Sequence, residues 1–202
     1  MNARIFAALV AVFTLPLLGA AADTDAPTGI PQYDAAGHLI FPADYREWVF
    51  LSSGLDMSYS NAPAMPDAHM FNNVFAPRTA YEAFLKTGVW PDKTMLILEN
   101  RGGGSDVSIA KRGVVQTGEL MGREVHVKDT ARFKGGWAFF AFDGDKPAEQ
   151  IGYGASCYSC HQQHAAADTT FVQFYPTLLP AATKLGTLNP SYVKETAHQS
   201  PQ

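Results

Sequence analysis

Residues 124–128, Glu-Val-His-Val-Lys, alternate polar and apolar side chains. A period of two is typical of a β-strand with one buried face. Further strands are predicted on both sides of this stretch, at 94–99 and at 136–142, where short apolar or aromatic runs are bounded by turn residues. Residues 70–75 and 107–115 also have the composition of strands. This succession of short strands predicts a sheet-based domain rather than an all-helical one.

Helix patterns occur between and after these strands. Residues 77–88 begin with a proline that suits a first helical turn and end with a glycine that suits a helix C-terminus. Residues 42–51 also favour a helix, with Asp44 as its cap and Trp48, Val49 and Leu51 as its apolar side. Together with the strands, they predict an α+β fold, in which an antiparallel sheet is flanked by a few helices.

The remaining segments are predicted to be irregular. Residues 54–67 are rich in Ser, Asn, Pro and Gly and favour a loop. The glycine-rich stretch 101–106 favours a flexible connection, because no Gly-Lys-Ser/Thr follows it as in a phosphate-binding loop. The chain from about Ala155 is expected to be helical or irregular, and residues 189–202 are expected to form a polar tail.

The N-terminus has the order of a secretory signal peptide. Two basic or polar residues precede an apolar run over 5–18, and small residues follow at 19–22. We therefore expect cleavage near Ala22, a single domain over 23–202 and a periplasmic location, with no membrane anchor after processing. The alternative is a retained N-terminal anchor, although the apolar run is shorter than the roughly 20 residues that span a bilayer. With a net charge of −4 and no basic run, the 202-residue chain lacks the features of a nucleic-acid-binding protein.

The two cysteines of the chain form the motif Cys157-Tyr158-Ser159-Cys160-His161. This is the C-x-x-C-H pattern of covalent haem attachment, in which each thiol adds to one vinyl group and the histidine binds the iron. We predict one haem c, held by Cys157 and Cys160 and ligated by His161. A thioredoxin-like pair favours a position early in the chain, a zinc site needs four ligands, and a disulfide does not require His161.

The opposite face of the iron is left open by the motif. A sixth protein ligand favours electron transfer, whereas an open face favours binding of, or chemistry on, a small ligand. Candidate sixth ligands are the methionines and histidines outside the motif, each of which is more often a core or surface residue: Met57, Met65, Met70, Met95, Met121, His38, His69 and His126.

Taken in order, several segments resemble the cytochrome P-460 family, which includes the cytochromes c′-β. They are residues 44–49, 81–88, 91–99, 127–133, 136–139, 157–161 and 171–176. The resemblance implies a β-rich haem domain, usually a homodimer, with a five-coordinate haem whose vacant face lies in a pocket lined by the sheet.

The resemblance also separates two branches. The branch that oxidises hydroxylamine is expected to carry a haem-cross-linked lysine at the position of Leu98 and a glutamate at the position of Gln163. Neither leucine nor glutamine can play those roles, since glutamine has no titratable carboxyl. The gas-binding branch has a hydrophobic cap over the iron, for which Phe71, Phe75 and Leu98 are the candidates.

We therefore expect a protein that binds nitric oxide, carbon monoxide or a related diatomic ligand at a five-coordinate haem, with a redox protein as a further potential partner. The alternatives are an enzyme that oxidises hydroxylamine or nitric oxide, and a six-coordinate electron carrier. The two substitutions favour a protein that is not an enzyme.

Overall fold

The computed structural model describes residues 29–60 and 68–197. The expected signal peptide and Met65 lie outside these ranges. Five strands form one antiparallel sheet in the order β1-β2-β3-β4-β5, so each strand pairs with its neighbours in the chain. The strands are β1 (Val49–Leu55), β2 (His69–Ala76), β3 (Met95–Ser105), β4 (Val114–Lys128) and β5 (Trp137–Phe142).

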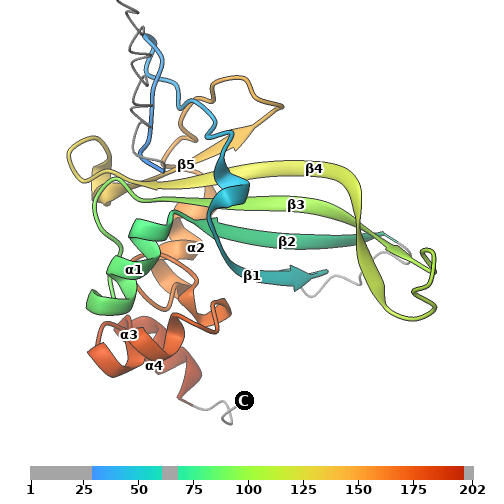
Figure 1. Ribbon diagram of the computed structural model, residues 1–202. Coiled ribbons are helices and arrows are strands. Elements are labelled where there is room, and N and C mark those ends of the chain that lie inside the picture. Colours follow the sequence, from blue (N-terminus) through green and yellow to red (C-terminus); the bar gives the residue numbers. More distant parts are fainter. Residues whose placement is uncertain (1–28, 61–67, 198–202) are drawn as a thin grey trace, which may run out of the picture.

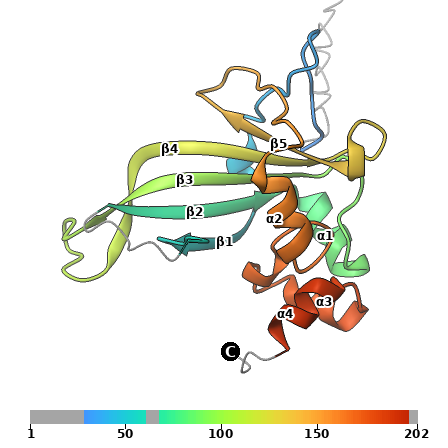
Figure 2. The same ribbon diagram turned by 180° about the vertical axis from the view of Figure 1, so that it is seen from behind.

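The helices gather at one end of the sheet and against one of its faces (Figures 1 and 2). They are α1 (Arg78–Thr87), α2 (Ser156–His164), α3 (Leu179–Leu185) and α4 (Pro190–Thr196), with short 3-10 turns η1 (Tyr45–Glu47), η2 (Lys134–Gly136) and η3 (Val172–Phe174). Together they confirm the predicted α+β fold. None of the helices in the described parts of the chain is long and apolar enough to cross a bilayer.

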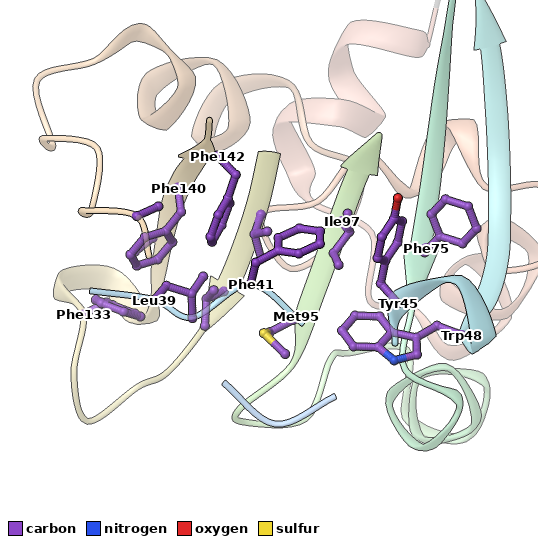
Figure 3. Packing of buried hydrophobic residues seen from close by; sticks show 14 residues of the cluster. Leu39, Phe41, Tyr45, Trp48, Phe75, Met95, Ile97, Phe133, Phe140 and Phe142 are labelled. Atoms are coloured by element: carbon purple, nitrogen blue, oxygen red, sulfur yellow. The ribbon is translucent and has the colours of Figure 1, made fainter. Parts of the chain in front are cut away.

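Each face of the sheet has its own hydrophobic core. On one face, the segment before β1 packs Leu39, Phe41 and Tyr45 against strand residues such as Ile97 and Phe140 (Figure 3). On the other face, the helices pack against a second buried cluster that includes Phe84, Trp90, Leu96, Trp137 and Leu178. The sheet is therefore covered on both faces, and the helix-covered face is the one that also borders the cavity described below.

The expected helix over 42–51 is wrong. Only the single turn η1 forms after Asp44, and β1 begins at Val49. The Asp44 side chain accepts a hydrogen bond from Trp48 Nε1, at 3.3 Å, instead of capping a helix. A short isolated helix is only marginally stable in water, whereas pairing with β2 satisfies the backbone of this segment from Val49 onward. For the same reason the strand continues through Gly54 and Leu55, where a loop was expected.

The glycine-rich stretch 101–106 is also mostly strand rather than loop. β3 runs through Gly102, Gly103 and Gly104 and ends at Ser105. A Cβ on Gly103 would lie 2.7 Å from Val114 Cγ1 and 2.8 Å from His69 Cβ, so side chains of both neighbouring strands occupy the space above it. The glycines therefore permit close cross-strand packing.

Two other boundaries differ from the expectation. The strand expected at 107–115 starts only at Val114, after a turn, and then continues for 15 residues to Lys128. The expected polar tail from Asn189 contains α4, whose first turn has a proline. Asn189 ties this helix to the end of α2, because its backbone N–H donates to Ala166 O at 2.8 Å and its amide donates to Ala165 O at 2.5 Å.

Candidate haem-binding site

The cysteine motif lies on α2 and faces a cavity of about 630 Å³. Cys157, Cys160 and His161 line one side of this cavity, and Val74, Leu98 and Glu124 line it from the sheet. These three sheet residues are aligned across β2, β3 and β4, because Leu98 is the register partner of both Val74 and Glu124. The volume lies within the range of pockets that enclose cofactor-sized molecules.

The two cysteines are free thiols, both half-buried at the cavity. Burial raises the pKa of the Cys157 thiol, which is the opposite of the lowered pKa that a reactive redox cysteine needs. Within residues 29–60 and 68–197, no three His, Cys, Asp or Glu side chains are grouped so that they could hold a metal ion. The pair therefore lacks the features of a thioredoxin-like or zinc site.

His161 is oriented by a hydrogen bond on one side of its ring. Its Nδ1 lies 2.9 Å from the carbonyl oxygen of Thr169. Since a carbonyl only accepts hydrogen bonds, Nδ1 carries the proton and Nε2 keeps a free lone pair. Burial lowers the pKa of His161, although the Thr169 carbonyl opposes this effect, so the neutral imidazole that binds metals is the stable form near pH 7.

Aromatic rings surround this imidazole. The ring centroid of Phe171 lies 4.1 Å from that of His161, and the centroid of Phe139 lies 4.7 Å away. His126 stacks on Phe139 at 4.0 Å and meets the His161 ring edge-on at 4.9 Å. The rings hold His161 in a single orientation, with Nε2 as its only free nitrogen.

These residues fit a covalently bound haem: two thiols one helical turn apart, a neutral imidazole with a free nitrogen, and an adjoining largely apolar cavity. The family model for Cytochrome P460 matches residues 42–172. The chain belongs to the cytochrome P460 family. It is therefore a haem cytochrome, and Cys157, Cys160 and His161 are the residues that would hold the haem. A search of curated proteins finds no match to this cytochrome.

The structure separates the three residues expected to cap the haem of this cytochrome. Leu98 lines the cavity. Phe75 belongs to the core on the opposite face of the sheet, and its register partner Ile97 lies in the same core. Phe71 is four residues before Phe75 on the same strand, so it also points to that face. The expectation that Phe71 and Phe75 cap the pocket is therefore corrected, and only Leu98 is placed to do so.

Among the candidate sixth ligands that lie within residues 29–60 and 68–197, only Met57 and His126 line the cavity of the cytochrome. His126 is in edge contact with His161, which leaves no room for an iron ion between the two rings. Burial also lowers its pKa well below the usual value, and its Nε2 has no hydrogen-bond partner in the described parts of the chain. Met57 is thus the remaining candidate of the described set on the cavity wall.

Glu124 is a cavity residue that the sequence analysis did not identify. Its carboxyl lines the cavity next to Leu98, and burial raises its pKa. Glu124 and Gln163 are both solvent-accessible, but Gln163 on α2 does not line the cavity. The alternating pattern at 124–128 placed Glu124 and His126 on one face of a strand, but only the packing of α2 shows that this face borders the site.

Proposed function

We propose that this cytochrome carries one covalent haem c whose only protein ligand is His161, and that it binds a small neutral ligand such as nitric oxide or carbon monoxide on the face toward the sheet. Leu98 is the observation that carries the proposal. It places an aliphatic side chain at the centre of the sheet wall, between Val74 and Glu124, where the resemblance described above implies a cross-linking lysine in the oxidising branch.

The cavity wall supports an open iron face. Of the described lining residues, His126 is held against His161 and so cannot serve as a second iron ligand. This leaves the thioether of Met57, a ligand type that favours electron transfer when it binds iron. A neutral diatomic ligand bonds to iron without needing a polar partner, so the aliphatic side chains of Val74 and Leu98 are compatible with it. Export to the periplasm and a homodimeric state belong to the same proposal, supported by the N-terminal residue pattern and by the family resemblance.

The visible spectrum of the purified protein, oxidised and then reduced, tests this proposal. We expect an ordinary c-type haem that is high-spin in both states, and a new spectrum when nitric oxide or carbon monoxide is added to the reduced protein. Low-spin bands in both states would instead indicate a sixth protein ligand, for which Met57 is the described candidate, and would make the protein an electron carrier. A strongly red-shifted Soret band in the reduced state would indicate a cross-link to the haem.

Glu124 favours a second candidate function, the oxidation of a small nitrogen compound such as hydroxylamine. A carboxyl that lines the cavity, and whose pKa is raised by desolvation, is placed to exchange a proton with a bound small molecule, as a general base must. The absence of a carboxyl at Gln163 therefore does not argue against an enzyme, and Leu98 is the remaining departure.

Glu124→Gln distinguishes the two functions. If the protein is an enzyme, this variant should lose about 10²- to 10⁴-fold in hydroxylamine oxidation, together with the pH dependence of the rate. Glu119→Gln, which changes an exposed residue of the same strand, is the matched control and should keep full activity. If the protein only binds gases, the wild type and both variants should show no oxidation, while each still binds carbon monoxide.

A further inference from the structure

The hydrogen bond to His161 comes from an unusual turn. Ala167 and Thr170 pair across this turn, with Thr170 N–H donating to Ala167 O at 2.8 Å. Asp168 and Thr169 between them have φ values of 45° and 59°. Two-residue turns with positive φ at both central positions strongly favour asparagine and glycine, and a β-branched residue such as Thr169 is strained there. Contacts outside the turn must therefore hold it in place.

The carboxylate of Asp168 supplies those contacts. Its Oδ2 accepts hydrogen bonds from the backbone N–H of Trp90 at 2.8 Å and from Lys128 Nζ at 2.7 Å. Its Oδ1 lies 3.3 Å from Trp137 Nε1. One side chain thus links the turn to the α1–β3 connection, to β4 and to β5.

Lys128 strengthens the same connection. Its ammonium also donates to Trp90 O at 2.6 Å, and both members of the Lys128–Asp168 pair have side chains that are only 15% exposed. Next to them, Thr170 is fully buried and accepts a hydrogen bond from Trp90 Nε1 at 2.9 Å. A largely buried, charge-assisted pair of this kind is stronger and less screened than one on the surface.

We infer that Asp168, together with Lys128, is a positioning group that holds the Thr169 carbonyl against Nδ1 of His161 and thereby sets how strongly this histidine donates electrons to the haem iron. Hydrogen bonding at the far nitrogen of a metal-bound histidine fixes its tautomer and raises its basicity. The strained turn brings the carbonyl to Nδ1, and the ion pair keeps the turn in that conformation. The inference rests on the proposed ligation of iron by His161, but not on which small ligand the protein binds.

Resonance Raman spectroscopy of the reduced protein, together with its midpoint potential, tests the inference. Asp168→Asn removes the charge but keeps the size, and asparagine tolerates positive φ. Lys128→Met removes the partner charge from the other side. We expect both variants to lower the wavenumber of the Fe–His stretching band and to raise the midpoint potential, because a less basic imidazole stabilises ferric iron less.

Glu195→Gln is the matched control. It removes the charge from the 3.0 Å contact of Glu195 with His164, which also joins α2 to another element but does not touch the Thr169 turn. Its Raman band and potential should equal those of the wild type. A structural role alone would lower the melting temperature of the Asp168 and Lys128 variants without moving either quantity, and that result would overturn the inference.

Two further outcomes are distinguishable. If neither variant folds, the wild-type protein decides, since its Fe–His band must lie at the high wavenumber of a hydrogen-bonded imidazole, and a band typical of a free imidazole would overturn the inference. If the wild type is low-spin and has no such band, the proposed five-coordinate haem is contradicted. The midpoint potentials of the variants then carry the test, and unchanged potentials would reject the role of Asp168.

Discussion

Neighbouring residues of β3 serve opposite faces of the sheet. Leu98 lines the cavity, whereas the fully buried Glu99 points to the other face. There Glu99 accepts hydrogen bonds from Tyr45 and Arg46, and its Oε1 lies 2.8 Å from Arg101 Nε. Side chains alternate along a strand, so the side chain at one position faces the haem site and the side chain at the next position faces a charged cluster. Substitutions in the sheet can therefore be aimed at the site with single-residue precision.

Leu98→Ala should speed the association of carbon monoxide with the reduced protein. Removal of the aliphatic side chain leaves more room for the ligand at the sheet wall of the cavity. We expect the association rate constant to rise up to about tenfold, equivalent to roughly 1.4 kcal/mol in the barrier. Flash photolysis or stopped-flow mixing measures the rate. Phe71→Ala, on the opposite face of the sheet, is the control and should leave the rate unchanged. Equal rates in all three proteins would show that Leu98 does not limit access.

The site was predictable from the sequence only where its chemistry is local. The spacing within one helical turn was enough to identify Cys157, Cys160 and His161 as a set. The resemblance to the gas-binding branch suggested Phe71 as part of an apolar cap, but the direction of its side chain depends on the register of β2 with β3. The role of Thr169 could not be predicted, because a backbone carbonyl leaves no trace in side-chain identity.

At the level of elements, the end of α1 depends on a close contact with the segment that follows α3. Gly88 ends the helix with φ of 73°, and its N–H donates to Phe84 O at 2.7 Å. Its carbonyl accepts a hydrogen bond from Thr187 Oγ1 at 2.8 Å. Glycine is needed here both for its backbone conformation and for the space it leaves.

Gly88→Ala should destabilise the protein by about 1–3 kcal/mol, the usual cost of a strained left-handed residue. The added Cβ would lie 2.3 Å from Thr187 Oγ1, so the contact with Thr187 should also be displaced. Urea unfolding measures the loss. Gly118→Ala in β4 is the control, because no atom lies within 4 Å of its added Cβ and its φ is not left-handed. If both variants unfold at the same urea concentration, the end of α1 is not strained by a side chain.

Elements that are defined by residues within their own segment were predicted well. Elements that depend on pairing with another strand were not. The helix that ends at Gly88 has its own stop signal, and it formed where expected. β1 and the glycine-rich part of β3 are strands because a neighbouring strand pairs with them, which overrides their weak propensity. Most of β4 was missed in the same way, since only residues 124–128 show a clean alternation.

At the scale of the whole molecule, the buried carboxylate Glu99, on the face of the sheet opposite the haem site, stabilises the fold through its charge. Burial alone would raise the pKa of Glu99, but hydrogen bonds from Arg101, Tyr45 and Asn73 and the charge of Arg46 outweigh it and lower the pKa to about 2. Arg46 comes from the segment before β1, so this carboxylate joins that segment to the sheet. The lowered pKa makes the connection sensitive to acid.

The free energy of unfolding should therefore begin to fall in acid at pH values at which Glu99 of the folded protein is still mostly ionised. A carboxyl with a lowered folded-state pKa stabilises the fold above its unfolded-state pKa of about 4.5, and this contribution, about 3 kcal/mol, is lost as the pH falls toward 2. Urea unfolding at a series of pH values measures it. Glu99→Gln should be less stable at pH 7 and should show a flatter pH dependence between 4.5 and 2. A variant with the wild-type slope would assign the acid sensitivity to other groups.

The strand order also has a consequence for how the chain folds. Every strand pairs only with its neighbours in the chain, so the sheet can assemble by adding one strand at a time to the strand before it. The residues of α2 come after all five strands, and the sheet-side wall of the cavity is complete without them. The sheet wall that faces the cysteine motif is therefore encoded entirely before the helix that carries the motif, so this wall can form without that helix.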